Sequence, residues 1–161
     1  MLRDADIDPA PLSGKTVSII GFGNQGRAQA LNLRDSGVAV QIGLRPGSLH
    51  ADSVRAEQLP VLTLADAGRT ADVLMLLAPD EHLPAIYASI EPQLRPGTAL
   101  GFSHGLAIHF GQISPRADLD ILMVAPKGPG SALRTLYQSG KGMVGLAAVA
   151  QDATGGAWPL A

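Results

Sequence analysis

Several features that would assign this chain to whole classes of protein are missing from its sequence. It contains no cysteine, so disulfide bonds, thiolate metal sites and cysteine nucleophiles are all excluded. Its 12 basic and 14 acidic residues nearly cancel, which gives no electrostatic case for binding nucleic acid or an anionic membrane surface. The longest apolar runs, such as residues 73–79 and 146–150, are far shorter than the roughly 20 residues of a membrane-spanning helix.

The composition and the N-terminal segment further restrict the fold class and the expected location of the protein. Only 4% of the 161 residues are aromatic although 46% are hydrophobic, so the core consists of Ala, Val, Leu and Ile, as is usual between helices and a buried parallel sheet. The first residues are acidic and interrupted by prolines, without the apolar segment of a secretory signal. We therefore expect a cytoplasmic protein, with an extended arm over residues 1–14 and a single domain over residues 15–161.

Short β-forming runs alternate with helix-compatible segments along that domain. The run at residues 71–79 is apolar almost throughout, which is typical of a strand buried on both faces at the centre of a sheet. The alternation predicts an α/β fold, a Rossmann-type doubly wound, mostly parallel sheet with helices on both faces. The predicted strands are 16–20, 38–42, 59–62, 71–79, 98–102, 120–125 and 144–149, and the predicted helices are 24–36, a piece ending near 58, 63–70, 80–90 and 131–139.

A glycine pattern lies between the first predicted strand and the first predicted helix. Gly21, Gly23 and Gly26 have the G-x-G-x-x-G spacing of dinucleotide-binding folds. In that motif the first glycine allows a tight turn, the second lets the backbone approach a pyrophosphate, and the third lets the helix pack on the strand. The helix N-terminus then faces the phosphates. The spacing alone is also compatible with an ordinary turn, so the surrounding residues decide the interpretation.

The residues that follow the other strands support a nucleotide site. Arg45 and Ser48 follow the second strand, where a fold that prefers NAD places an acidic residue for the ribose. A guanidinium with a hydroxyl suits the 2′-phosphate of NADP instead. Ala78, Pro79 and Asp80 follow the fourth strand and are expected to border the cofactor.

Two loops farther along the chain carry candidate catalytic side chains. His104 follows the fifth strand and Lys127 follows the sixth. His104 is suited to proton transfer, and Lys127 to holding a negatively charged substrate or an oxyanion. His109 lies between Ile108 and Phe110, and we expect it to be packed rather than reactive. No convincing set of oxygen ligands for Mg²⁺ is evident, so a metal site is not predicted, and neither is a serine hydrolase.

Several blocks together resemble the ketol-acid reductoisomerases, also called acetohydroxy acid isomeroreductases. These blocks are residues 21–37, 43–45, 75–81, 103–113 and 124–130, followed by Gln151 and Asp152 with the glycines after them. They cover nearly the whole chain in the right order. The blocks ALNLRDSG at 30–37 and APKGPG at 125–130 are the most specific.

The resemblance implies the NADP-binding N-terminal domain of an enzyme of valine, leucine and isoleucine synthesis. Members of the family convert 2-acetolactate by a Mg²⁺-dependent alkyl migration and an NADPH reduction. By position, His104 and Lys127 match active-site residues of the family, and Arg45 and Ser48 match its 2′-phosphate loop. The cofactor-binding residues that we predict are Gly21, Phe22, Gly23, Asn24, Gln25, Gly26, Arg45, Ser48, Leu77, Ala78, Pro79, Asp80, His104 and Gly130.

The chain also departs from the family pattern. His50 stands where many members have a second phosphate-binding serine, and Arg27 and Ser131 stand where histidine is usual. The helical C-terminal domain that carries the Mg²⁺ carboxylates in the family is absent from these residues. We therefore expect NADPH binding without isomeroreductase activity by this chain alone, with association either between copies or with a helical domain. Two alternatives stay open: a stand-alone NADPH-dependent 2-keto acid reductase, and a non-catalytic nucleotide-binding or interaction module.

Overall fold

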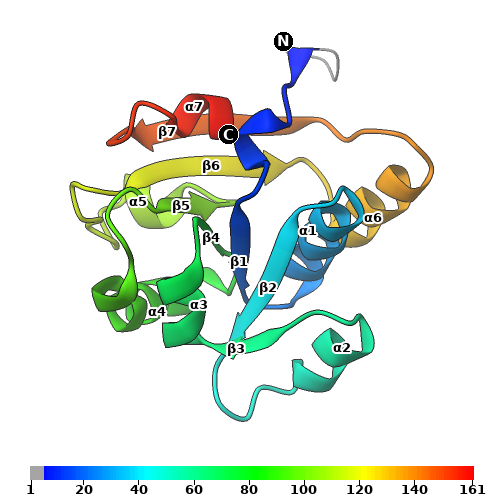
Figure 1. Ribbon diagram of the computed structural model, residues 1–161, viewed down its shortest axis with the longest axis horizontal. Helices are drawn as coiled ribbons and strands as arrows, with labels where there is room; N and C mark the ends of the chain where they lie inside the picture. The colour runs from blue at the N-terminus through cyan, green and yellow to red at the C-terminus, as the bar shows by residue number, and fades with distance from the viewer. Residues whose placement is uncertain (1–5) are drawn as a thin grey trace.

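A computed structural model of the chain describes residues 6–161 as a single sheet of seven strands packed between helices (Figure 1). The strands are β1 (Thr16–Ile20), β2 (Ala39–Leu44), β3 (Val61–Thr63), β4 (Val73–Leu76), β5 (Ala99–Phe102), β6 (Asp120–Pro126) and β7 (Gly145–Gln151). The α-helices are α1 (Asn24–Asp35), α2 (Ala51–Ala56), α3 (Leu64–Thr70), α4 (Leu83–Ile90), α5 (Leu106–His109), α6 (Gly130–Gln138) and α7 (Ala157–Leu160). Short 3₁₀ turns are η2 (Ala10–Leu12), η3 (Asp80–His82) and η4 (Glu91–Gln93). No helix of the described part is long and apolar enough to cross a membrane.

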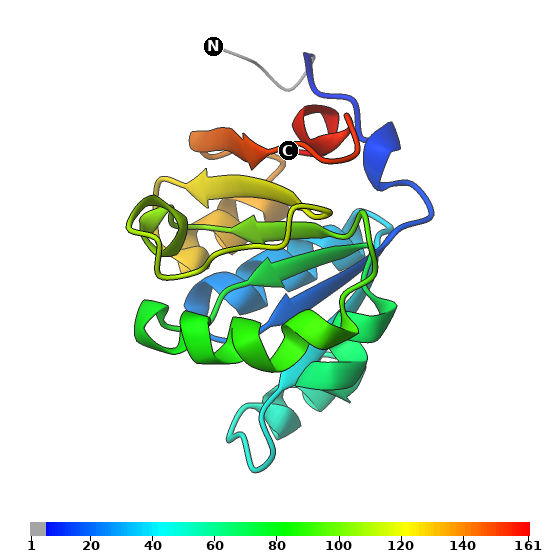
Figure 2. The ribbon, with the colours of Figure 1, turned by 90° about the vertical axis from the view of Figure 1, so that its left-hand side faces the viewer.

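The order of the strands confirms the predicted doubly wound sheet. The order is β3-β2-β1-β4-β5-β6-β7, with parallel pairing from β3 through β6 and antiparallel pairing of β6 with β7. Figure 2 shows the strands stacked edge to edge, with β7 and α7 at one end of the stack. From β1 the chain adds β2 and β3 on one side, and β4 to β6 are then added on the other side of β1. The order of the strands therefore reverses between β1 and β4. In such folds ligands bind beside that point, outside the carboxyl ends of the strands.

Side-chain alternation in the central strand β4 divides the core into two layers. Leu74 and Leu76 pack on the face that α3 and α4 cover, together with Ile86 and Ile90 of α4. Val73 and Met75 point to the opposite face, which α1 and α2 cover. All four side chains of β4 are buried, because helices cover both faces of the sheet. The central position predicted for this strand is therefore correct.

Two local predictions were wrong, and two short helices were not predicted. Residues 1–5 of the predicted arm lie outside the described residues, and the remainder is not extended throughout, because Pro9 and Pro11 lie at the start of a 3₁₀ turn at Ala10–Leu12, where proline is tolerated. The segment after the fifth strand contains the short helix α5, and the chain ends in α7, neither of which the sequence pattern indicated. The helix predicted over residues 80–90 is divided, with η3 at Asp80–His82 and α4 beginning at Leu83.

Candidate functional site

The glycine loop has the backbone geometry that the spacing predicts. Gly21 has a φ of +97°, which L side chains rarely adopt. A Cβ at Gly26 would lie 2.5 Å from the carbonyl oxygen of Gly21, so α1 can approach the end of β1 only with glycine there. A Cβ at Gly23 would meet no atom within 4 Å. The second glycine therefore faces open space, where a pyrophosphate needs a bare backbone.

Two helices begin beside this loop, and neither has a side-chain cap. α1 follows Gly23 and α6 follows Pro129, without a side-chain hydrogen bond at either first turn. A Cβ at Gly130 would lie 2.0 Å from the carbonyl oxygen of Asn24, so the two helices meet in close contact. Between them and the loop after β2 is a cavity of about 290 Å³, lined by Phe22, Gly23, Asn24, Arg27, Ala28, His50, Gly130, Ser131 and Arg134. Uncapped N–H groups and helix dipoles favour an anion there.

The loop after β2 forms a tight turn at the predicted 2′-phosphate position. The N–H of Ser48 donates to the carbonyl of Arg45 at 3.1 Å, and Gly47 has a φ of +73°, as in a type II turn with proline at its second residue. The Arg45 side chain is exposed. Of this loop, His50 lines the cavity, whereas Arg45 and Ser48 lie outside its lining.

Two glutamines of α1 connect the glycine loop to the loops after β5 and β6. Gln25 donates through Nε2 to the carbonyl of Gly128 at 2.8 Å, and Gln29 donates to Oγ of Ser103 at 2.9 Å. Ser103 in turn donates to the carbonyl of Val124 at 2.9 Å. Gln25 and Gln29 are four residues apart and therefore share one face of the helix. Sequence reasoning included Gln25 but missed Gln29, which this spacing could have indicated.

His104 and Lys127 both lie on exposed loops at the carboxyl edge of the sheet. Nδ1 of His104 accepts from the N–H of Leu106 at 3.2 Å and lies 3.8 Å from Oδ2 of Asp80. The His104 side chain is 66% exposed. Lys127 is exposed, and its backbone N–H donates to the carbonyl of Val144 at 2.8 Å. The bonds that join these loops therefore run through Gln25 and Gln29, not through the two candidate catalytic side chains.

The expectation for His109 was wrong. The side chain is exposed at the end of α5, where its ring meets the Phe110 ring edge to face with centroids 4.7 Å apart. Phe110 is itself 70% exposed. The apolar neighbours in sequence did not bury this histidine, because α5 has only four residues and buries Ala107 instead.

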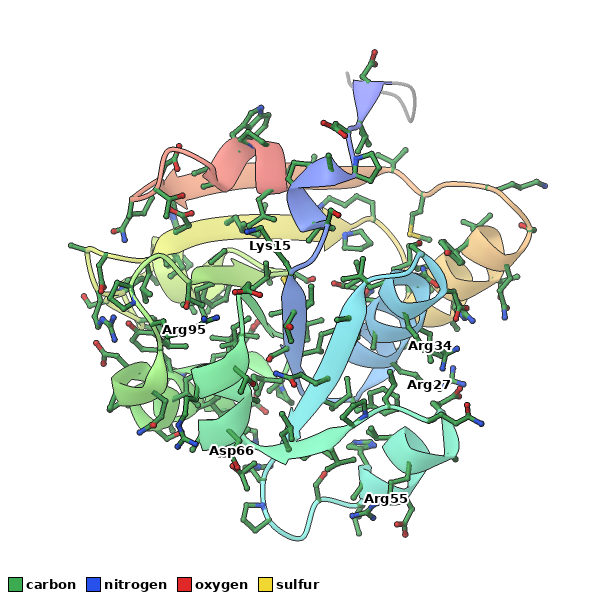
Figure 3. All side chains as sticks on the ribbon, in the orientation of Figure 1. Lys15, Arg27, Arg34, Arg55, Asp66 and Arg95 are labelled. Carbon is green, nitrogen blue, oxygen red and sulfur yellow. The ribbon has the colours of Figure 1, made fainter. Side chains whose placement is uncertain are left out.

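An arginine of α1 that the sequence motifs did not single out as a ligand also belongs to this region. Arg27 forms an ion pair with Glu57, and Arg34 donates to the carbonyl of Glu57 at 2.6 Å. Figure 3 shows Arg27 and Arg34 between α1 and α2. Their side chains hold the end of α2 against α1, on the side of the loop that leads to His50.

With this geometry in view, comparison with known proteins identifies the family. Residues 11–161 match the family model described as acetohydroxy acid isomeroreductase, NADPH-binding domain. The chain belongs to this family. It is 54% identical to a ketol-acid reductoisomerase (NADP(+)) of Beutenbergia cavernae and 51% identical to one of Kineococcus radiotolerans, in each case over 100% of this chain and 47% of the relative. A solved NADH-preferring ketol-acid reductoisomerase from an uncultured archean matches with a TM-score of 0.93 and 42% identity, over 97% of this chain and 49% of that one.

These matches confirm the resemblance and fix which part of the family is present. The chain spans about half the length of the reductoisomerases that it matches, and that half is the NADPH-binding domain. The residues fit the cofactor, because the open backbone at Gly23 and the uncapped helix ends provide an anion cradle. They do not fit Mg²⁺: within residues 6–161 no group of three or more His, Asp or Glu side chains is placed to hold a metal ion.

A larger, apolar groove lies elsewhere in this acetohydroxy acid isomeroreductase domain, on the face of the sheet that α1 covers. Its volume is about 310 Å³, and its lining comes from β1, β4, β6, α1, α6, η2 and the C-terminal residues. The groove is lined by Leu12, Val17, Gln29, Asn32, Leu33, Ser36, Val73, Met75, Leu122, Val124, Pro126, Leu133, Leu160 and Ala161. Most of these side chains are apolar, so the groove does not suit the phosphates of a nucleotide.

Proposed function

We propose that this domain binds NADPH and presents it for the reduction step of the acetohydroxy acid isomeroreductase reaction, with 2-acetolactate or its ethyl homologue as substrate. The observation that carries the proposal is the glycine loop between two uncapped helix N-termini, in a domain of this family. NADPH supplies the hydride. The chain supplies the cradle for the phosphates and the carboxyl edge of the sheet, where the substrate meets the nicotinamide.

The proposed roles of the cofactor-binding residues follow from their positions around this edge. The loop from Gly21 to Gly26, together with Gly130, holds the pyrophosphate. Arg45 and Ser48 hold the 2′-phosphate. Residues 77–80 border the cofactor where the chain leaves β4, and Asp80 is the first residue of η3. Removal of the positive charge at Arg45 is therefore expected to weaken NADPH more than NADH.

The proposed catalytic roles belong to His104 and Lys127. The N–H of Leu106 donates to Nδ1 of His104, which leaves the proton of a neutral imidazole on Nε2, free to face a substrate. Asp80 lies beside the same ring, with Oδ2 3.8 Å from Nδ1. Lys127 supplies an ammonium for the carboxylate or oxyanion of the 2-keto acid. Neither residue provides the ligand set that the Mg²⁺-dependent migration requires.

We propose that a helical domain of the kind the family carries supplies those ligands and packs on this one. Relatives are about twice as long as this chain. The apolar groove with Leu160 and Ala161 at its wall offers a surface for such packing, since an exposed apolar patch of this kind marks an interaction site. Self-association through the same surface is the alternative, and sedimentation at high protein concentration separates the two. A cytoplasmic location fits a chain without cysteine.

Calorimetry with NADPH and NADH is the central test. The preference needs measurement, because a relative 42% identical prefers NADH. The loop after β2 carries Arg45 and no acidic residue, which favours NADPH. We expect NADPH to bind at least tenfold more tightly than NADH. If neither nucleotide binds detectably, only one alternative remains, namely that the domain is a non-catalytic interaction module.

Turnover assays test the second half of the proposal. The domain alone, with NADPH, Mg²⁺ and 2-acetolactate, is expected to show no turnover, because the metal ligands are missing from it. Measurable turnover under these conditions would contradict that expectation. Oxidation of NADPH with simple 2-keto acids in the absence of Mg²⁺ would instead support a stand-alone reductase that uses His104 and Lys127.

A further inference from the structure

The cavity beside the glycine loop is lined by an arginine to which no ligand is yet assigned. Arg27 immediately follows Gly26 in α1, and its side chain lines the cavity together with Asn24 and His50. None of the described residues that line this cavity is acidic. No carboxylate of the cavity lining would therefore repel an anion that approaches the Arg27 guanidinium.

The other arginine in the wall is already engaged by acceptors of α1. Arg134 donates to Oδ1 of Asn32 at 2.9 Å and forms an ion pair with Asp35, and its side chain is only 13% exposed. The Arg134 guanidinium, followed by that of Arg34, holds the pKa of the Asp35 carboxyl below its usual range. Arg134 is thus fixed along α1 and supports the contact between α1 and α6.

Arg27 is held differently. One of its terminal nitrogens pairs with the Glu57 carboxylate, and its side chain is 49% exposed. Glu57 cannot move freely, because Arg34 binds its carbonyl oxygen at 2.6 Å. Figure 3 shows Arg27 and Arg34 on the same side of α1. A guanidinium presents donors on more than one edge, so the pairing with Glu57 leaves further N–H groups for a second anion.

We propose that Arg27 is a further ligand of the 2′-phosphate of NADPH, and that Glu57 is the counter-charge that holds its guanidinium in reach and competes for it. The inference rests on the proposed binding of NADPH by the glycine loop. The 2′-phosphate is favoured over the pyrophosphate because His50, which is two residues after the Arg45–Ser48 turn and donates its backbone N–H to Oγ of Ser48 at 3.3 Å, lines the same cavity. Arginine pairs with phosphate through short, charge-assisted hydrogen bonds.

The test is calorimetric titration of wild type, Arg27→Gln and Arg55→Gln with NADPH and with NADH. Arg27→Gln is expected to weaken NADPH at least tenfold and NADH less than twofold. Arg55→Gln is the matched control, because Arg55 pairs with Asp52 on α2 and does not line the cavity, and both of its affinities are expected to remain unchanged. Arg27→Lys keeps the charge and is expected to recover part of the loss.

The outcomes distinguish a failure of the role proposed for Arg27 from a failure of the proposed NADPH binding. Equal losses for NADPH and NADH would assign Arg27 to the pyrophosphate or to the packing of α2, and would overturn the 2′-phosphate role. No loss for either nucleotide would overturn it as well. If wild type itself fails to bind NADPH, the proposed function fails, whatever Arg27 does. Circular dichroism of each variant shows whether the domain remains folded.

Glu57→Gln tests the competition. The substitution keeps the shape of the side chain and removes the charge that shares Arg27, so NADPH is expected to bind about threefold more tightly. In the Arg27→Gln background the same change is expected to have no effect on NADPH, because the coupling between the two positions has been removed. A gain of the same size in both backgrounds would show that Glu57 acts without Arg27 and would overturn this part of the proposal.

Discussion

Polar side chains at the amino edge of the sheet have partners within the protein, whereas those of the candidate site at the carboxyl edge are exposed. At the amino edge, Asp72 accepts from the N–H of Thr16 and from Arg95, both at 2.8 Å. Asp120, which is 3% exposed, accepts from the N–H and the hydroxyl of Thr154 at 3.0 and 2.6 Å. These polar groups have their partners within the protein.

At the carboxyl edge the side chains of the candidate site project into solvent. Arg45, His104 and Lys127 are all exposed, and the bonds in this region hold the backbone and the glutamines of α1 instead. Polar groups at the amino edge therefore fasten the strands together, whereas the exposed groups at the carboxyl edge are the ones for which we propose partners in a ligand. Substitutions at the amino edge should therefore reduce stability, and those at the carboxyl edge should reduce binding.

The largest expected effect concerns a position at the carboxyl edge where close packing of the backbone depends on a glycine. Gly26→Ala places a methyl group 2.5 Å from the Gly21 carbonyl oxygen, and α1 must move away from β1. We expect a loss of about 2 to 3 kcal/mol in the free energy of unfolding, since overpacking of this kind against backbone is poorly relieved. Urea unfolding measures the loss, and NADPH binding should fail as well.

Gly23→Ala is the matched control within the same loop. Its methyl group would meet no protein atom within 4 Å, so stability should fall by less than about 1 kcal/mol. NADPH binding should nevertheless weaken strongly, because the methyl group lies where a pyrophosphate approaches the backbone. Equal stability losses for the two alanines would contradict the distinction between a packing glycine and a binding glycine.

The next effect belongs to the amino edge. Asp120→Ala leaves the N–H and the hydroxyl of Thr154 without their acceptor beside a buried position. A loss of about 2 kcal/mol in stability is expected, with NADPH affinity unchanged within about twofold. Asp52→Ala is the control, because that carboxylate is 97% exposed in its pair with Arg55 and should contribute less than about 0.5 kcal/mol. A large fall in NADPH affinity on Asp120→Ala would break the separation of the two edges.

Much of this division could be predicted from the sequence. The nearly continuous apolar run of residues 71–79 predicted the central strand, and the glycine spacing of residues 21–26 predicted the loop, because both signals are local in the sequence. The residues that follow β2, β5 and β6 could be assigned to one edge, because parallel strands bring their carboxyl ends together. The doubly wound sheet and its helices on both faces follow from the same alternation of strands and helices.

The rest depends on contacts that sequence patterns do not encode. The pairing of Arg27 with Glu57 joins residues 30 apart, and the bond from Gln25 to Gly128 joins residues 103 apart. The exposure of His109 depends on how short α5 is, not on its neighbours in sequence. The partners of Asp120 at the amino edge likewise come from a loop 34 residues later. Such contacts form only when distant segments pack, so propensity and spacing could not predict them.

A smaller effect should depend on pH. The N–H of Thr16, followed by Arg95 at the amino edge, holds the pKa of the Asp72 carboxyl below its usual range. A carboxyl whose folded pKa is lowered stabilises the fold above its unfolded pKa and loses that contribution as pH falls through the folded value. Asp72→Asn should therefore cost about 1 kcal/mol at pH 7, a modest amount because the pair is partly exposed.

The gap between wild type and Asp72→Asn should close as the solution is acidified. Urea unfolding at pH 7 and at successive steps below pH 4 follows the difference, which should approach zero once the wild-type carboxyl is protonated. A difference that stays constant across this range would mean that shape rather than charge matters at Asp72. Asp52→Asn is the control at pH 7 and should leave the free energy of unfolding almost unchanged, because that side chain is 97% exposed.

The smallest effect on stability is expected at the two candidate catalytic residues, and it probes the comparison most directly. His104→Gln removes one 3.2 Å acceptor for the Leu106 N–H at an exposed position, and Lys127→Met changes a side chain that is exposed on its loop. Each should alter the free energy of unfolding by less than about 0.5 kcal/mol, because water replaces the lost contacts. Urea unfolding checks this, and a loss above 1 kcal/mol would mean that the carboxyl edge also holds the fold together. In a chain that includes a helical domain of the family, either substitution is expected to lower turnover, as the proposed catalytic roles require.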